Sequence, residues 1–257
     1  MARFVRLFKH DLLLNQKTYL FALVGLSIAI YAFTYFIMFA NRGGFNRAED
    51  YIPLILFYLM GIGVFIGTAF PALNNQIKMS NYLLAPGSIF EKYLVQFVIR
   101  VVLFIPVALL LFWLGTHLAK VSMIPDPRNG FDPSRIQDFH FRDLFKDVPT
   151  FRDKLIIILS IFSFATVLFA GSAWFNRFAL VKTLIVSGIM IGAVLLSFVL
   201  FSHLFYPDMV YGFDIHIRNY KVTEDLENVQ LFFYLIGGLS WLFFLSLAYF
   251  KLKEKEV

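Results

Sequence analysis

The chain has 257 residues, of which 59% are hydrophobic and only 16% are charged. A soluble domain usually carries about 25% charged residues, so this composition excludes an ordinary soluble protein and requires lipid to cover much of the apolar surface. The absence of cysteine excludes a disulfide scaffold and a thiol enzyme, and the net charge of +6 favours contact with anionic lipid head groups over nucleic acid.

The N-terminal residues 1–18 are predicted to form an amphipathic helix. Phe4 and Phe8 lie on one face at helical spacing, and Arg3 and Arg6 lie on the other. This pattern is typical of a helix in the plane of the membrane with its basic residues at the head groups. The alternative is an ordinary positively charged flank that sets the topology.

Six apolar stretches are each long enough to cross a membrane as a helix. A bilayer core about 30 Å thick needs roughly 20 apolar residues, and lipid offers no hydrogen-bond partner to an unpaired amide. The runs are continuous rather than alternating, which disfavours a barrel. The sequence therefore predicts an all-α, polytopic membrane protein with one domain, residues 1–257. Its predicted spans are residues 19–40, 52–72, 94–118, 155–175, 183–204 and 229–250.

Orientation is predicted from the Lys and Arg residues of the loops. Their numbers divide equally between the two sides, but their placement does not. The flank before the first span is basic and holds a single acid, Asp11, whereas most of the opposing basic residues share one loop with several Asp. We therefore expect both termini to lie on the cytoplasmic side.

The predicted inner segment between the second and third spans is residues 73–93. Pro86 and Gly87 interrupt it, and Ser88 followed by Glu91 forms a capping box. The third helix is therefore expected to start at Ser88, several residues before the lipid. Its exposed start is either a docking surface for a partner or a well-capped helix without one.

Arg100 is a charged residue inside a predicted span. It shares a helix face with Lys92 and Gln96, since the three follow at intervals of four. Two roles are open for it: its side chain snorkels to the interface, or it lines a polar path or pairs with an acid of another subunit. Further along the same span, Pro106 predicts a kink.

Two pairs of glycines predict close contacts between helices. Gly63 and Gly67 share a face of the second span, and Gly188 and Gly192 share a face of the fifth. The long outer loop, 119–154, is expected to place a short helix on the membrane surface, because apolar residues recur after its turn-rich first half.

Motifs for chemistry are absent from the sequence. It contains no G-x-x-x-x-G-K-[ST], H-E-x-x-H or G-x-S-x-G pattern, and its five histidines show no metal-ligand spacing. The predicted spans hold no Asp or Glu, which argues against a proton-coupled carrier that uses carboxylates. We therefore expect no enzyme activity, metal or cofactor in this chain, and any transport would draw its energy from another polypeptide.

The layout of a basic N-terminal helix, six spans and a helical inner segment resembles the permease subunits of ABC-2-type exporters. The stretch YLLAPGSIFEKYL at 82–94 is similar to the L-x-L-P-A-S-x-x-E-K-x-L stretch of a bacterial subgroup. Ala85 and Gly87 depart from it. The matching positions are Leu84, Pro86, Ser88, Glu91, Lys92 and Leu94.

The resemblance implies that the segment 73–93 couples this chain to a separate ABC ATPase subunit. Leu84, Pro86, Ser88, Glu91 and Lys92 would then be the coupling candidates. Two permease subunits, identical or different, would pair in the bacterial cytoplasmic (inner) membrane, and the ATPase would rock them to export a substrate.

One departure from the family is that the longer outer loop follows the third span instead of the fifth. A second interpretation fits the same architecture, namely a non-transporting membrane scaffold, assembly factor or immunity protein.

Overall fold

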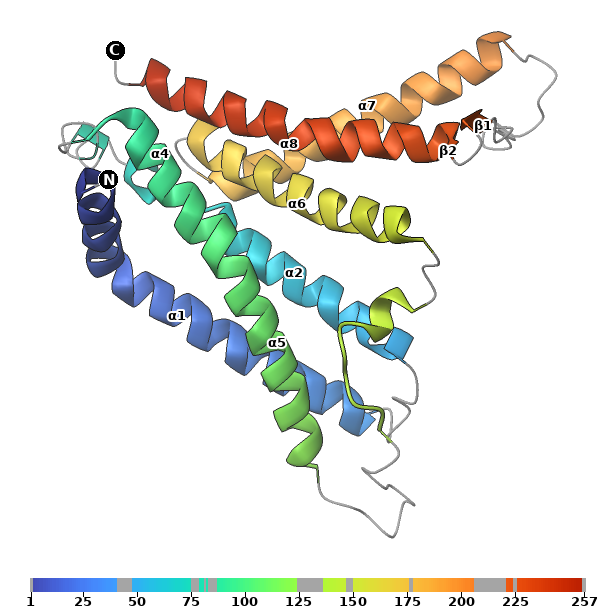
Figure 1. The fold of residues 1–257 in the computed structure, drawn as a ribbon, viewed down its shortest axis with the longest axis horizontal. Coiled ribbons are helices and arrows are strands. Elements are labelled where there is room, and N and C mark those ends of the chain that lie inside the picture. Colours follow the sequence, from blue (N-terminus) through green and yellow to red (C-terminus); the bar gives the residue numbers. More distant parts are fainter. Residues whose placement is uncertain are drawn as a thin grey trace.

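The computed structural model describes residues 2–40, 48–74, 79–80, 82, 87–123, 136–146, 150–175, 178–205, 221–223 and 226–255. Within these ranges the chain is almost entirely helical, as the all-α prediction requires (Figure 1). The long elements are α1 (Ala2–Ala40), α2 (Ile52–Ile66), α4 (Ile89–Phe97), the π-helical segment η3 (Val98–Leu103), α5 (Phe104–Val121), α6 (Phe151–Trp174), α7 (Ala179–Phe205) and α8 (Asn228–Glu254).

Short elements join the long helices. The 3₁₀ turns are η1 (Ala48–Tyr51), η2 (Pro71–Asn74) and η5 (Asp143–Phe145). Two strands, β1 (Lys221–Thr223) and β2 (Leu226–Glu227), pair antiparallel just before α8 and form a small exception to the helical fold.

Four helical stretches of the described chain are long and apolar enough to cross a membrane. They are Arg3–Ala40, Glu49–Ile66, Ile89–Val121 and Phe151–Trp174. They overlap the first four predicted spans, with different bounds. The chain therefore has the helices of a membrane protein, and α7 and α8 form helices over the fifth and sixth predicted spans.

The helices alternate in direction between two ends of the molecule (Figure 1). The N-terminus, the start of α4 and the C-terminus lie at one end, and the C-terminal ends of α1 and α5 lie at the other. We call these the inner and outer ends, after the predicted topology. α6 joins the two halves of the fold, because it packs against α2 on one side and against α7 and α8 on the other.

Aromatic rings fill the core where α2, α4, α6 and α8 meet. The Tyr93 ring lies 5.7 Å from that of Phe169 and 5.8 Å from that of Tyr249, and Phe70 approaches Phe169 from the end of α2 at 5.2 Å. The Tyr93 hydroxyl donates to the Leu245 carbonyl at 3.0 Å. Such ring pairs add about 0.5–1.5 kcal/mol each beyond the burial of their area, so α4 is held firmly to α6 and α8.

The second predicted span is shorter than expected. Its α-helix ends at Ile66 instead of continuing to residue 72. Pro71 explains the stop, because it lacks the amide that a continuing helix needs and disfavours helical geometry in the residue before it. The chain continues as the 3₁₀ turn Pro71–Asn74.

The predicted distortion of the third span lies one turn before Pro106. Val98–Leu103 form a π-helical segment in which the Phe104 amide donates to the Ile99 carbonyl, five residues back. Because a proline ring clashes with the carbonyl four residues before it, a wider turn at this point gives the ring room.

Residues 136–146, the part of the apolar second half of the outer loop that the structure describes, do not form the helix predicted for the membrane surface. Ile136 and Phe139, two of the apolar residues of this half, are 1% and 6% exposed inside the protein, and Asp143–Phe145 forms only one 3₁₀ turn. The correction has a simple cause: the Phe139 ring lies 5.1 Å from the rings of both Tyr51 and Phe112, which offer it a more specific contact than lipid does.

Gly63 and Gly67 lie at close contacts between helices. A Cβ atom added at Gly63 would lie 2.9 Å from Leu168 Cδ1 on α6, and one added at Gly67 would lie 2.5 Å from Leu180 Cδ1 on α7. Both distances are shorter than carbon atoms tolerate. Glycine at these positions therefore lets α2 approach its neighbours.

Gly188 and Gly192 make no such contact in the described part of the chain. An added Cβ would meet nothing within 4 Å at either position, and their apolar neighbours Ile189 and Ile191 are 66% and 62% exposed. The close helix contact that this pair predicts is therefore not made within the described chain.

Replacing Gly171 with alanine is expected to destabilise the fold by roughly 1–3 kcal/mol, the usual cost of overpacking. The added methyl group would overlap Thr183 Oγ1 and lie 2.6 Å from Thr183 Cβ, which forces α6 and α7 apart. Gly188→Ala is the matched control, since its methyl group meets nothing and alanine favours a helix by about 0.5–1 kcal/mol. The unfolding midpoint in detergent, followed by circular dichroism, measures both, and equal midpoints would contradict this packing.

Candidate functional site

The start of α4 is fixed by the predicted capping box. The Ser88 Oγ accepts a hydrogen bond from the Glu91 amide at 3.2 Å, and the Ser88 amide donates to Glu91 Oε2 at 2.9 Å. Two amides that no helical carbonyl can reach are thus satisfied. The predicted helix start is confirmed, because Ser88 is the N-cap and Ile89 the first helical residue.

Gly87 brings the chain into this cap against α1. Its φ of +155° is a conformation that side chains disfavour, and an added Cβ would lie 2.7 Å from Leu7 Cδ1. A residue larger than glycine would therefore be strained and would push against α1. This explains why Gly87 stands where the similar exporter stretch has alanine.

The other coupling candidates lie in different surroundings. Leu84 and Pro86 fall outside the described residues. The Lys92 side chain is 5% exposed and points into the protein, with its Nζ 5.7 Å from the centre of the Tyr82 ring. Burial raises the pKa of Tyr82, and the charge of Asp11 raises it further. At the start of α4, Ser88 and Glu91 thus face outward, whereas Lys92 belongs to the interior.

A polar cluster centred on Asp11 joins α1 to α4. Asp11 Oδ1 accepts hydrogen bonds from Asn15 Nδ2 at 3.0 Å and from Gln96 Nε2 at 2.8 Å, and Asp11 Oδ2 accepts one from the Tyr19 hydroxyl at 2.6 Å. Three donors around one carboxylate make a strong, charge-assisted arrangement. We call Asp11, Tyr19, Gln96 and Arg100 the inner polar cluster.

Arg100 connects this cluster to the end of α2. Its Nη1 donates to the Phe65 carbonyl at 2.9 Å and to Thr68 Oγ1 at 3.3 Å. Its guanidinium carbon lies 4.3 Å from the centre of the Phe65 ring and 5.2 Å from that of Tyr19. The last carbonyls of a helix lack partners within the helix and attract cations, so Arg100 acts as a side-chain cap for α2.

The snorkelling role considered for Arg100 is wrong. Its side chain is 1% exposed and reaches the end of α2 instead of the membrane surface. In the sequence, Asp11 stood out only as the single acid of the basic N-terminal flank, and no partner was predicted for it. The signal was present: Asp11, Asn15 and Tyr19 follow at intervals of four and therefore share one face of α1.

Some buried polar atoms in and beside the inner polar cluster have no hydrogen-bond partner among the described residues. They are Gln96 Oε1 and Arg100 Nε of the cluster and the hydroxyl of Tyr82 beside it. An unsatisfied buried group costs about 1–3 kcal/mol, so other pairings of these groups are energetically within reach.

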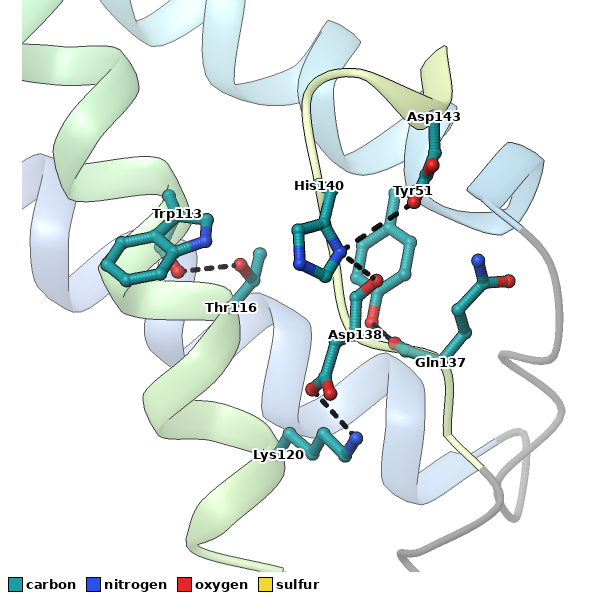
Figure 2. Close-up of polar contacts among 8 residues, drawn as sticks. All are labelled: Tyr51, Trp113, Thr116, Lys120, Gln137, Asp138, His140 and Asp143. Atoms are coloured by element: carbon teal, nitrogen blue, oxygen red, sulfur yellow. Dashed lines mark hydrogen bonds and ion pairs between the residues drawn. The ribbon is translucent and has the colours of Figure 1, made fainter. Parts of the chain in front are cut away.

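A second group of polar contacts fastens the outer loop (Figure 2). Lys120 Nζ lies 2.8 Å from Asp138 Oδ1, and the Tyr51 hydroxyl donates to the Gln137 carbonyl at 2.7 Å. The hydrogen bond from Lys120 holds the pKa of Asp138 below its ordinary value. This outer clamp ties the loop to α5 and to the start of α2. Within the described ranges, no group of three His, Asp or Glu residues could hold a metal ion.

Comparison with known protein families, curated proteins and solved structures finds no match to this chain. The interpretation of the inner polar cluster and of the capped α4 therefore depends on their geometry and on the short resemblance at 82–94.

Replacing Tyr19 with phenylalanine is expected to destabilise the protein by about 1.5–3 kcal/mol. The change keeps the ring and removes one hydrogen bond to a charged carboxylate. Tyr31→Phe is the control on the same helix, because the Tyr31 hydroxyl bonds Ser122 at an exposed position, where substitutions usually stay within about 0.5 kcal/mol. Denaturant titration in detergent compares them, and a similar loss in both variants would show that the Asp11 contact is unimportant.

The outer clamp is expected to weaken in acid. A carboxylate with a depressed pKa contributes stability that is present above its unfolded pKa and is lost as the pH falls through its folded value. Asp138 is mostly exposed, so the contribution stays below about 1 kcal/mol. Asp138→Asn should therefore flatten the decline of the unfolding midpoint toward low pH, with Asp143→Asn as the control at the same loop. If the midpoint of Asp138→Asn declined toward low pH as it does in the unchanged protein, the pair of Asp138 and Lys120 would not contribute to stability.

Proposed function

We propose that this chain is the membrane-spanning permease subunit of an ABC exporter. It would cross a bacterial cytoplasmic membrane six times with both termini inside, and a separate ATPase subunit would drive it. The observation that carries the proposal is the capped start of α4, which lies at the same end of the molecule as both termini (Figure 1). The exporter-like stretch at 82–94 includes this cap.

Helix lengths support the six crossings and the interfacial helix. α1 has 39 residues and is therefore about 58 Å long, nearly twice the thickness of a bilayer core of about 30 Å. Its first turns must lie outside the core, and they run at an angle to the rest of the helix (Figure 1). α7 and α8 have 27 residues each, which is more than a crossing needs.

The contacts of α4 explain how a partner at the inner end could move the helices. A displacement of the Ser88 cap would reach α1 through Gly87 and through the bond from Gln96 to Asp11. It would reach α2 through Arg100, which lies on the same face of the helix about one turn beyond Gln96. One docking event would therefore act on three helices together.

The sequence has no phosphate-binding loop, which fits an ATPase on a separate subunit. A second permease subunit, identical or different, would complete a translocation path between the two copies. Lipid would cover the remaining apolar faces, and no nucleic acid is involved. The alternative, a non-transporting scaffold, assembly factor or immunity protein, predicts that no ATPase binds at the start of α4.

The double variant Ser88→Ala and Glu91→Ala tests the docking role. Loss of an N-cap costs about 0.5–2 kcal/mol locally, too little to unfold a helical bundle but enough to loosen the first turn of α4. We expect an adjacent reading frame to encode an ABC ATPase, and we expect the double variant to show normal membrane insertion, reduced copurification of that ATPase and reduced transport-dependent ATP turnover.

Thr150→Ala is the matched control for this variant. Thr150 caps α6 at the outer end, where its Oγ1 accepts from the Asp153 amide at 3.2 Å. The variant Thr150→Ala removes an N-cap of the same kind far from the proposed docking surface, so ATPase binding should be unaffected. Unchanged binding and turnover in the Ser88 and Glu91 variant, or the absence of an adjacent ABC ATPase gene, would favour the scaffold.

A further inference from the structure

Three lysines from two other helices converge on the C-terminal end of α6. Their contacts are Lys255 Nζ to the Ala173 carbonyl at 2.8 Å, Lys251 Nζ to the centre of the Trp174 ring at 4.7 Å, and Lys182 Nζ to the centre of the Phe175 ring at 5.9 Å. The last residues of α6 and its C-cap residue Phe175 thus meet lysines from the start of α7 and from the C-terminal end of α8 and the residue after it. This corner lies at the inner end, where the C-terminus is marked (Figure 1).

The three lysines carry more positive charge than Glu254, the one acidic residue described beside them, can neutralise. Glu254 pairs with Lys251, and the Ala173 carbonyl satisfies one donor of Lys255 at the negative end of the α6 dipole. Burial lowers the pKa of Lys255, and the nearby charge of Lys251 lowers it further, so these ammonium groups lie close enough to repel each other. Lys182 adds a third charge on the exposed side.

Exposed aromatic residues border the lysines. Trp174, Phe178 and Phe250 are 44%, 77% and 60% exposed. Aromatic side chains beside lysines are typical of the boundary between the lipid core and the head groups. A free anion would gain nothing from these rings, whereas a lipid would bury its upper acyl carbons against them.

We propose that this corner binds the head group of an anionic phospholipid. Phosphate oxygens would accept hydrogen bonds from the Nζ atoms of Lys182 and Lys251, and the acyl chains would lie along Trp174 and Phe178. We call Lys182, Lys251 and Trp174 the lysine corner. The proposal requires only that the helices lie in a membrane, and it is independent of the transport function and of any ATPase.

Quenching of Trp174 fluorescence by brominated lipids tests the site directly. The chain has three tryptophans, and the changes Trp113→Phe and Trp241→Phe leave Trp174 as the single reporter. The protein is reconstituted into vesicles of phosphatidylcholine that contain increasing fractions of either brominated phosphatidylglycerol or brominated phosphatidylcholine. We expect brominated phosphatidylglycerol to quench at a severalfold lower fraction.

Lys182→Gln and Lys251→Gln should each reduce this preference about fivefold, because a basic residue near an anionic membrane surface contributes about 1 kcal/mol. Lys154→Gln is the control, since it removes the same charge from the outer end of α6. Lys182 is exposed, so its variant keeps the fold, which circular dichroism verifies.

Equal quenching by the two brominated lipids would overturn the proposal. An equal loss of preference in Lys154→Gln would also overturn it, because the effect would then reflect overall charge. Millimolar inorganic phosphate is added as a competitor. Abolition of the preference by phosphate would assign a site for free anions instead of a lipid, whereas a preference that survives it supports the lipid.

Discussion

A helix that ends inside an apolar protein leaves carbonyl groups that water cannot reach, and this chain meets the problem at the end of α2. Pro71 prevents the helix from continuing, and the Phe65 carbonyl accepts hydrogen bonds from Thr68 and from the guanidinium of Arg100. Thr68 alone already satisfies this carbonyl, whereas the guanidinium of Arg100 is buried and needs partners, so its bonds to Phe65 and Thr68 hold the end of α2 against the face of the third span that carries Arg100. The positions of α1 and α4 follow from this contact, since the Tyr19 ring lies beside the same guanidinium and its hydroxyl binds Asp11.

The inner polar cluster connects α1, α2 and α4 strongly, although some of its hydrogen-bonding atoms have no partner among the described residues. A carboxylate with three donors resists separation, whereas Gln96 and Arg100 each keep a buried polar atom without a partner among the described residues. In a packed apolar interface, a helix shift would create voids and lose contact energy. Hydrogen-bonding groups can instead exchange partners at similar energy. For the proposed permease, this places the contacts of Gln96 and Arg100 about two and three helical turns from the cap at which the ATPase would act.

The two ends of the bundle are built for different surroundings. At the outer end, Phe139 and Tyr51 pack together and Asp138 pairs with Lys120, so the described part of the loop is fastened to the helices. At the inner end, the lysines of the described residues outnumber the one described acid beside them, Glu254, and lie beside exposed aromatic rings. The first arrangement seals a surface of the protein. The second is suited to anionic lipid, and it agrees with the positive charge expected on the cytoplasmic side.

Local features were predictable from the sequence because their causes lie within a few residues. The capping box joins Ser88 to Glu91 three positions later, and the apolar runs specify helices because lipid allows no other backbone pairing. The tertiary structure alone decided which polar groups meet. Gln96 and Asp11 are 85 residues apart in the chain, and no local pattern brings them together. The role of Arg100 likewise depends on where α2 ends, because a carbonyl attracts a cation only when packing places the two within reach.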